Sequence, residues 1–548
     1  MKANIPRFSS FLTILPALCA VSFSPTASAQ EENETESTDG TSGGEGEEAA
    51  SEVSPSEGEA SEGATGTSDA EGEASAPESA DSSGVESGGG LFESASGGDE
   101  EASDSALSLQ WGGYVRGDIF VGAVPGPIKA GETEPGPKEP GINAAYGEVS
   151  LQPLVKAGSW GSAFADLRVR YGQQLENNGL IVDLREAYAS AYMGPVELRM
   201  GKQIVVWGKA DGFNPTNNIS AADFRIRSPI EDDRRIGNVG ARGFLTFNPV
   251  KLEVVWMPLY EPTMYPEFTP TDGVTRFTDP SYPSVSLRNS LIAGRFHLEL
   301  SSFDASLSYL YGHAPLPGIA LESFQVGSTT LDPMLTENAY VQVQRKAYQQ
   351  HVIGGDFSTT VSDWFGLRGE TAFRLPVNYK NVAWAARPDL QWVLGIDREF
   401  GPVSVIAQYL GRYTFDWEPA RPPDPRGVQG LLALNNNDPA DRATAEVGIQ
   451  NSLFNTNRIL FNQLYQLQSL ASLRLEWKTL HETLSLSALA LYNFNTQEWF
   501  VGPKIGYQIG GGFNAYLGAE LYGGKKDTLM DLIDEKLTAG YFELRASF

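Results

Sequence analysis

The sequence has very little cysteine or histidine: Cys19 is the only cysteine, and there are 4 histidines among 548 residues. Cys19 falls within residues 1–29, which we predict to be a secretory signal. Two basic residues there precede an apolar stretch, and Ala27 and Ala29 form a small-residue cleavage site. The mature chain would then have no thiol and no disulfide. Because the histidines are also far apart, we predict no metal site and no cofactor.

Two further absences concern apolar runs and positive charge. After residue 29, no stretch reaches the roughly 18 consecutive apolar residues of a membrane-spanning helix. Residues 31–107 contain 23 acidic residues and no Lys or Arg, and they have hardly any aromatic residues. Such a composition buries too little apolar surface to offset the loss of chain entropy. We therefore predict that residues 30–106 form a disordered acidic extension, which would not bind nucleic acid.

The remainder of the chain, residues 108–548, is only mildly acidic. It holds 38 of the 40 basic residues and 46 of the 69 acidic ones, a net charge of -8. Its residues form short runs rich in aromatic and branched side chains, separated by turn residues, with no convincing amphipathic helix. We predict an all-β fold with 18 strands, at 107–121, 144–155, 162–171, 180–192, 196–207, 238–247, 251–257, 290–300, 304–311, 349–360, 365–375, 390–400, 403–415, 459–478, 484–494, 500–509, 513–522 and 539–548.

The connections between these strands alternate in length. Those after even-numbered strands have about two to six residues, as in tight hairpins. Most of those after odd-numbered strands are long, namely 124–143, 208–237, 258–289, 312–348 and 416–458. Short turns at one end and long loops at the other are typical of transmembrane antiparallel β-barrels. The pattern predicts such a barrel over residues 107–548, with both termini periplasmic. One misread hairpin would change the strand number to 16 or 20.

Alternation within the strands predicts which face meets water. In 162–171, Asp166, Arg168 and Arg170 share one face, and aliphatic residues share the other. In the last strand, Phe542, Leu544 and Phe548 lie opposite Glu543 and Arg545. A charged face opposite an apolar one fits a lumen opposite lipid, although a soluble sandwich would alternate in the same way. The strand ending on Phe548 resembles the closing strand of Gram-negative outer-membrane barrels. The resemblance implies that Phe542, Leu544 and Phe548 form an insertion signal read by the barrel-assembly machinery.

One segment carries a more specific resemblance. Gly201, Lys202 and Gln203 are followed by Trp207 and Gly208, and then by a loop containing Asn214 and Pro215. This pattern resembles a porin-like family of outer-membrane barrels of unknown function. It is more loosely similar to the alginate-export barrels, which have a Gly-Arg-Gln strand. The resemblance covers about thirty residues, and it implies residence in the outer membrane without implying a substrate.

The loop after Trp207 is the best candidate for a functional site. By analogy of position with general porins, we predict that this loop folds into the lumen and narrows it. Charges of both signs there would orient small polar solutes, or would pair with one another and hold the loop in place. The loop candidates are Asp211, Asp223, Arg225, Arg227, Glu231, Asp232, Asp233, Arg234 and Arg235, and a matching basic wall could come from Arg168, Arg170, Arg199, Arg368 and Arg374.

These features predict a porin-like channel for passive diffusion of small polar or ionic solutes, without enzymatic activity. The expected partners are outer-membrane lipid, lipopolysaccharide and the barrel-assembly machinery, with a possible homo-oligomer. Two alternatives stay open at this point. One is a dedicated barrel that exports or imports a polymer or a hydrophobic compound. The other is a structural or assembly barrel whose acidic extension contacts a periplasmic partner.

Overall fold

The structure is a computed structural model, and it describes residues 107–126, 136–175, 177–265, 274–327, 339–362, 364–435, 437–526 and 528–548. The predicted signal, 1–29, and the predicted acidic extension, 30–106, lie outside the described residues. The main sheet consists of β1 (Leu107–Gly126), β2 (Gly136–Ala157), β3 (Gly161–Gln174), β4 (Asn177–Met193), β5 (Val196–Gln203), β6 (Asn238–Phe247), β7 (Val250–Met257), β9 (Leu291–Leu300), β10 (Phe303–His313), β13 (Gln349–Val361), β14 (Phe365–Pro376), β15 (Asp389–Phe400), β16 (Val403–Thr414), β17 (Leu467–Thr479), β18 (Leu484–Asn493), β19 (Trp499–Gly510), β20 (Phe513–Gly523) and β21 (Ala539–Ser547).

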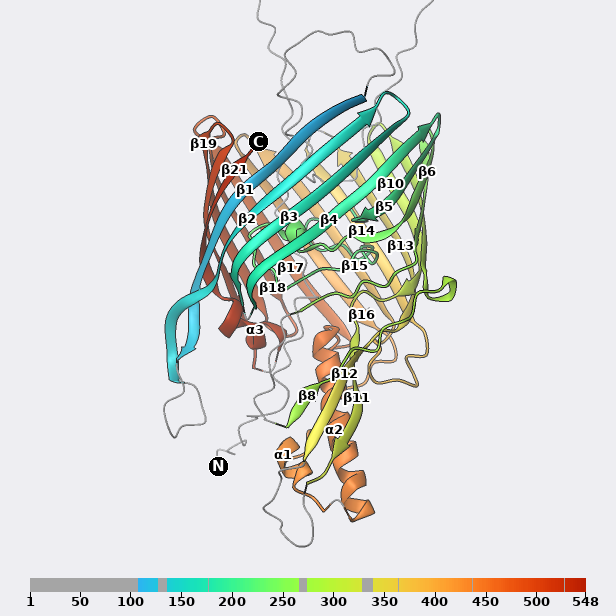
Figure 1. The fold of residues 1–548 in the computed structure, drawn as a ribbon, viewed down its shortest axis with the longest axis vertical. Helices are drawn as coiled ribbons and strands as arrows, with labels where there is room; N and C mark the ends of the chain where they lie inside the picture. Colours follow the sequence, from blue (N-terminus) through green and yellow to red (C-terminus); the bar gives the residue numbers. More distant parts are fainter. Residues whose placement is uncertain are drawn as a thin grey trace, which may run out of the picture. The chain divides into compact units, whose positions relative to one another are not determined.

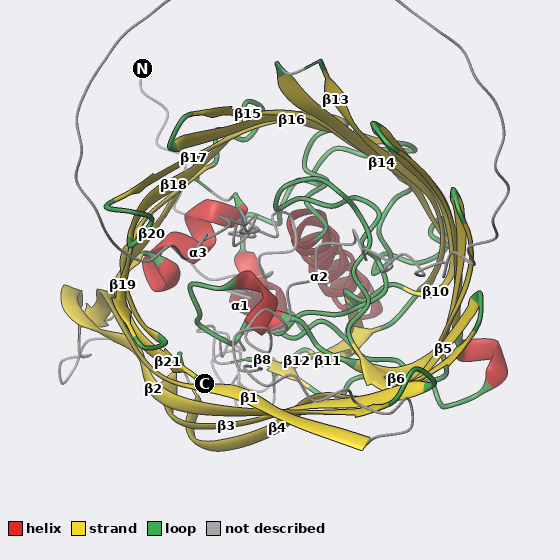
Figure 2. Ribbon diagram, turned by 90° about the horizontal axis from the view of Figure 1, so that it is seen from above, coloured by secondary structure: helices red, strands yellow, loops and turns green. Residues whose placement is uncertain are grey.

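These 18 strands form one closed antiparallel barrel (Figures 1 and 2). Each strand pairs with its neighbours along the chain, and β1 closes the ring by pairing with β21 as well as with β2. Closure leaves the sheet without an outer edge, which is the requirement for spanning a membrane with strands. The predicted all-β antiparallel barrel of 18 strands is confirmed, and each predicted strand overlaps one barrel strand.

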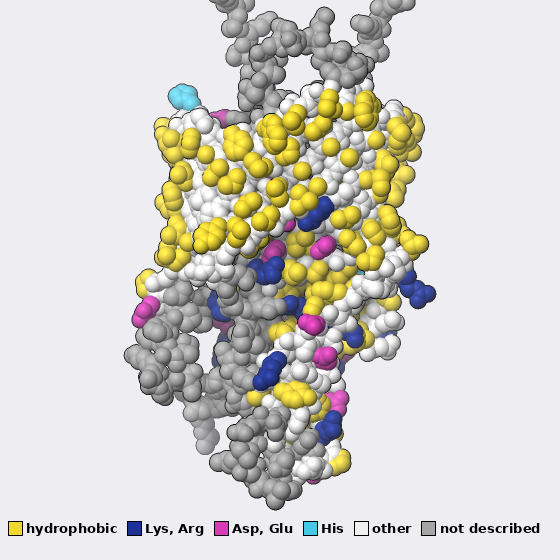
Figure 3. Space-filling view, viewed as in Figure 1, with side chains coloured by type: hydrophobic (Ala, Val, Ile, Leu, Met, Phe, Trp, Pro, Cys, Tyr) yellow, Lys and Arg dark blue, Asp and Glu magenta, His cyan; other side chains and the backbone are white. Residues whose placement is uncertain are grey.

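The two faces of the barrel wall differ in polarity, because alternate side chains along a strand point to opposite faces. In β21, Phe542 and Leu544 are 45% and 42% exposed on the outer face, whereas Glu543 is fully buried on the inner one. Arg168 and Arg170 of β3 are likewise buried inside. Apolar side chains are spread over the outer wall in the face shown in Figure 3, with few charged side chains among them. The outside of the barrel is therefore suited to lipid and the inside to water and charge.

Connections of very different length leave the two ends of the barrel. Two residues, Gly194 and Pro195, join β4 to β5, and Asn248 and Pro249 join β6 to β7. Figure 1 shows the C-terminus at the same end as these tight turns, while the helices and longer loops lie at the other end. None of the helices in the described part of the chain is long and apolar enough to cross a membrane.

The long-loop end carries structure that the sequence pattern did not predict. A second sheet contains β8 (Thr275–Phe277), β11 (Gly318–Gln325) and β12 (Tyr340–Lys346), in which β12 runs antiparallel to β11 and parallel to β8. It packs with α1 (Gly427–Leu432) and α2 (Pro439–Leu460) around a separate apolar core. We call these five elements the outer module. A third helix, α3 (Leu529–Leu537), packs against β20, and short 3-10 turns occupy Glu231–Arg234 and Leu287–Asn289.

Three predictions about elements are therefore wrong. The predicted absence of helices fails for α1, α2 and α3. The strand predicted from 459 begins at Leu467, because residues 459 and 460 complete α2, where Leu460 packs in the apolar core of the outer module. The strand predicted to reach Trp207 ends at Gln203. Its apolar continuation leaves the wall instead, and Val205 and Trp207 become fully buried inside the barrel.

Candidate functional site

Residues 204–237, which we call the inner loop, connect β5 to β6 and cross the inside of the barrel. The first half is held by Glu370 of β14. One carboxylate oxygen accepts hydrogen bonds from the backbone N–H of Thr216 (2.7 Å) and from its hydroxyl (2.8 Å). The other oxygen accepts from the N–H groups of Lys209 and Ala210, at 3.1 and 3.2 Å. A buried carboxylate that accepts several N–H groups orders the backbone that supplies them.

Gly208 makes this close approach possible. Its φ is +116°, a conformation that L side chains rarely adopt, and a Cβ atom there would lie 2.6 Å from a carboxylate oxygen of Glu370. Just before it, Trp207 donates its indole N–H to Glu253 of β7 at 3.0 Å. The Trp-Gly pair of the sequence motif therefore fixes the path of the chain inside the lumen, just after it has left the wall at Gln203.

The second half of the inner loop is tied to the opposite part of the wall. Asp233 lies between Arg116 of β1 and Arg168 of β3, with nitrogen–oxygen distances of 2.5 and 2.7 Å. Ser228 donates its hydroxyl to the same carboxylate at 2.6 Å, and Arg185 of β4 donates to the Asp232 carbonyl. Asp233 thus supplies a negative charge that the buried arginines of the wall require.

A third set of ion pairs joins the inner loop to the strands near the C-terminus. Arg227 lies 3.0 Å from Glu520 of β20, and Arg234 lies 3.4 Å from the same carboxylate. Asp211 pairs with Arg474 of β17 at 2.7 Å. Together with the bonds to β1, β3, β7 and β14, these contacts attach the inner loop on all sides of the barrel. The loop therefore spans the lumen instead of lining one wall.

The predicted site residues divide into three groups. Asp211, Arg227, Asp233 and Arg234 are buried inside the barrel on the inner loop. Two other pairs stay within the loop, Asp223 with Arg225 at 2.7 Å and Asp232 with Arg235 at 2.6 Å. The predicted basic wall is dispersed, and its arginines pair locally: Arg168 with Asp166 and Asp233, Arg170 with Glu148, Arg199 with Glu197, Arg368 with Asp397, and Arg374 with Asp389. The side chain of Glu231 lies outside the described residues.

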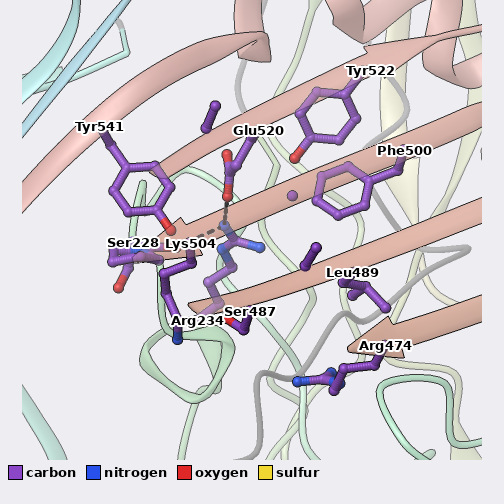
Figure 4. Close-up of a pocket in the computed structure, with 14 residues that line it drawn as sticks. Ser228, Arg234, Arg474, Ser487, Leu489, Phe500, Lys504, Glu520, Tyr522 and Tyr541 are labelled. Atoms are coloured by element: carbon purple, nitrogen blue, oxygen red, sulfur yellow. Dashed lines mark hydrogen bonds and ion pairs between the residues drawn. The ribbon is translucent and has the colours of Figure 1, made fainter. Parts of the chain in front are cut away.

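The inner loop leaves a cavity beside strands β17 to β21 (Figure 4). Its cationic lining residues are Arg234, Arg474 and Lys504, and Glu520 is its one carboxylate. Within the described part of the chain, Lys504 has no ion-pair partner, and its ammonium lies 5.6 Å from the ring of Tyr516. The remaining lining is largely aromatic, aliphatic or hydroxyl-bearing: Ser228, Pro229, Ser487, Ala488, Leu489, Phe500, Gly502, Ala519, Tyr522 and Tyr541.

A second cavity also borders Arg234. It is lined by Asn218, Ser220, Thr263 and Arg374 as well as by Arg234 itself. Arg234 is thus the one inner-loop cation that borders both spaces. We define the passage site as these two cavities and Arg234 between them. Among the described residues, no group of three or more Cys, His, Asp or Glu side chains is placed to hold a metal ion.

The sequence pattern missed Lys504 and Glu520, and it did not single out Glu370 as a site residue, although alternation placed Glu370 on the charged face of its strand. Lys504 and Glu520 also occupy inward positions of correctly predicted strands, so alternation could have identified them as lumenal. What alternation cannot supply is the partner, because the inner loop joins residues far apart in the chain. Glu370, for example, lies 154 positions from Thr216.

No family model matches the sequence, and no curated protein is similar to it. Solved structures with a similar fold include OccK3 (OpdO) of Pseudomonas aeruginosa, at 8% identity and a TM-score of 0.43, covering 80% of this chain and 95% of that one. OccK2 (OpdF) of the same organism, solved in complex with glucuronate, has 10% identity and a TM-score of 0.46, with 80% and 96% covered. A BenF-like porin from Pseudomonas fluorescens Pf-5 has 10% identity and a TM-score of 0.45, with 80% and 98% covered. The likeness to these structures is one of fold alone.

Proposed function

We propose that the protein is a porin-like channel of the outer membrane, which passes small polar or ionic solutes by passive diffusion. The observation that carries this proposal is the closed barrel with an apolar outer wall, a charged inner wall and two cavities beside the inner loop. Barrels of 16 to 18 strands are wide enough for an aqueous lumen. In this barrel the inner loop narrows that lumen, so passage would follow the strands β17 to β21.

The predicted constriction residues have a definite role in this proposal. Asp211 and Asp233 hold the inner loop to the wall through Arg474, Arg116 and Arg168. Arg234 and Lys504 face the space that remains. Their positive charges favour anions over cations of the same size, because a low-dielectric wall strengthens the interaction with a passing charge.

A liposome-swelling assay tests the proposal. The full mature protein is reconstituted into vesicles, which are then diluted into iso-osmotic solutions of sugars of increasing size. Solute entry that falls with solute size supports diffusion through a narrow aqueous passage. If no sugar enters, but entry appears once the inner loop is shortened, the native barrel is plugged and the proposal fails.

The position of the protein in the cell follows from the same proposal. The tight-turn end, which includes Phe548, would face the periplasm, and the outer module would face the exterior with its lipopolysaccharide. Phe542, Leu544 and Phe548 are exposed on the outer wall, where the barrel-assembly machinery could contact them. Deleting Phe548 should lower the yield of folded, heat-modifiable barrel in the outer membrane. An unchanged yield would argue against this insertion signal.

A further inference from the structure

A short segment projects outward from the barrel wall at the long-loop end. Residues 281–290, which we call the ledge, lead into β9 and contain the 3-10 turn Leu287–Asn289. This turn lies outside the ring of strands, where it is yellow-green in Figure 1 and is the unlabelled red turn in Figure 2. The ledge borders neither cavity of the passage site. It therefore has no part in the proposed channel and needs a separate explanation.

Hydrogen bonds hold the ledge in one conformation. Within it, the hydroxyl of Ser286 accepts from the N–H of Asn289 at 3.3 Å. The side-chain amide of Gln349, the first residue of β13, donates to the carbonyl of Arg288 at 3.3 Å. Tyr311 of β10 in turn donates its hydroxyl to Gln349 at 3.1 Å. The ledge is thus attached to the wall at two neighbouring strands and is not a freely moving loop.

The ledge exposes two aliphatic side chains. Val285 and Leu287 are 69% and 80% exposed. A single exposed aliphatic residue is ordinary on a protein surface. Two of them on one fixed projection are less favourable in water, because the ledge cannot fold over them and their apolar area stays hydrated. The tip of the ledge is therefore better suited to an apolar surrounding than to water.

The base of the ledge lies at the level of aromatic residues on the wall. β9 begins at Leu291, and the next residue, Ile292, is the cross-strand partner of Trp256 on β7 and of Tyr311 on β10. Ile292 and Trp256 are exposed on the outer wall. Trp and Tyr on membrane barrels gather where the hydrocarbon core meets the head groups. The ledge therefore leaves the wall at the membrane interface, within reach of the acyl chains beside the barrel.

Arg288 adds a positive charge beside the aliphatic residues. It is exposed, and in the described part of the chain no acidic side chain forms an ion pair with it. The ledge itself contains no Asp or Glu. Aliphatic side chains next to a cation are typical of segments that bind at the surface of an anionic membrane. The apolar groups enter the boundary of the acyl chains while the cation meets the anionic head groups.

We propose that the ledge binds lipopolysaccharide, with Val285 and Leu287 among its acyl chains and Arg288 at a phosphate of its head group. This inference rests on the proposed function, which turns the long-loop end toward the exterior. The ledge is continuous with the apolar outer wall at Ile292, which favours a lipid over a soluble partner. The unpaired guanidinium favours an anionic lipid over a zwitterionic one, because a phosphate can accept two hydrogen bonds from it.

A dye attached to the ledge tests whether it enters the membrane. Without residues 1–29 the chain has no cysteine, so Leu287→Cys, Leu307→Cys and Val447→Cys can each carry one environment-sensitive dye. Leu307 is 69% exposed on the outer wall, and Val447 is 58% exposed on α2. In vesicles of phosphatidylethanolamine and lipopolysaccharide, we expect apolar emission from positions 287 and 307 and aqueous emission from 447. Apolar emission from 307 with aqueous emission from 287 overturns the ledge proposal alone. Aqueous emission from both overturns the membrane location as well.

Lipid retention tests the anionic partner. The full mature protein is mixed with phosphatidylethanolamine and lipopolysaccharide in detergent and isolated again, and the bound lipopolysaccharide is measured for the wild type, Arg288→Gln and Arg426→Gln. The control removes the same charge from the segment before α1, where Arg426 is partly exposed. We expect Arg288→Gln to retain several-fold less lipopolysaccharide and Arg426→Gln to retain the wild-type amount. Equal retention in all three overturns the proposal. Cross-linking of two chains through Leu287→Cys in the same vesicles would also overturn it, because a second copy would then cover the ledge.

Discussion

Lys504 is the residue from which the electrostatics of the passage site can be tested most simply. It lines the cavity beside β17 to β21, and among the described residues it has no ion-pair partner. The arginines around it are different, because Arg474 is paired with Asp211 and Arg234 with Glu520. Glu476 and Glu543 interact with Lys504 electrostatically but form no ion pair with it. More of its charge is therefore left to act on a solute in the cavity than is left by the paired arginines.

Reversing this charge should change ion selectivity. In Lys504→Glu we expect the ratio of anion to cation permeability to fall several-fold, because a carboxylate repels anions at the same place. The reversal potential across a bilayer with a salt gradient measures this ratio. Lys380→Glu is the matched control, since Lys380 is 70% exposed on the loop between β14 and β15. Equal shifts in both variants would show that overall charge, and not the cavity, sets the selectivity.

At the scale of elements, the inner loop is held by charges that cannot easily be lost. Asp233 neutralises two arginines whose side chains are almost completely buried. Removing the sole partner of a buried charge costs about 3 to 5 kcal/mol. Loss of Asp233 costs less than this, because Arg116 keeps Glu148 at 2.7 Å and Arg168 keeps Asp166 at 3.0 Å. A partly exposed pair in the same loop, Asp223 with Arg225, is worth less.

Asp233→Asn should therefore loosen the second half of the inner loop. We expect larger or more strongly fluctuating single-channel conductance in this variant, and no change in Asp223→Asn, whose arginine partner is 39% exposed. Recordings at constant voltage distinguish the two. If Asp233→Asn conducts exactly as the wild type does, the ion pairs with Arg116 and Arg168 do not hold the loop.

The outer module offers a second test at this scale. Asn457 of α2 accepts a hydrogen bond from the N–H of Ile319 at 2.9 Å and donates to its carbonyl at 2.8 Å, and both residues are buried. Asn457→Ala leaves both groups of β11 unsatisfied, at about 1 to 3 kcal/mol each. We expect faster protease cleavage in α1 and α2 while the barrel stays intact. The Asn451→Ala variant, which is changed on a more exposed face of α2, should be cleaved by the protease at the wild-type rate.

These elements also show what sequence patterns can and cannot predict. The barrel strands were predictable because lipid on one face and polar lumen on the other impose a strict period of two. α2 was missed because the residues that it buries include Ala445, Gly448 and Asn457, which give almost no apolar periodicity. Asp438 caps this helix through the N–H of Ala440, and Asp438 followed by Pro439 is a helix start signal in the sequence itself.

The candidate site was predictable only in part. The length and position of the inner loop, and the density of charged residues in it, were enough to single it out as the candidate site. Its attachment to Glu370 and Glu520 depends on how far the loop reaches across the lumen, which no local pattern encodes. The apolar run through Trp207 was misleading for a physical reason. Part of the lumen is packed with apolar side chains, so an apolar run can point inward as well as toward lipid.

At the scale of the whole molecule, the barrel combines a wall suited to lipid with an interior that is partly packed and partly open. Apolar residues around Trp207 fill the space beside β7, β9, β10, β13 and β14. The cavities remain near β17 to β21 and around Arg234. A solute would therefore meet a narrow, off-centre path instead of a wide central pore.

Single-channel recording of the full mature protein in a planar bilayer tests this account most directly. We predict small, steady conductance steps with the inner loop intact, and larger steps when residues 209–235 are replaced by a short linker. The contradicting result is a protein that inserts as a folded barrel and shows no conductance until the inner loop is removed. The native molecule would then be a closed barrel and not a diffusion channel.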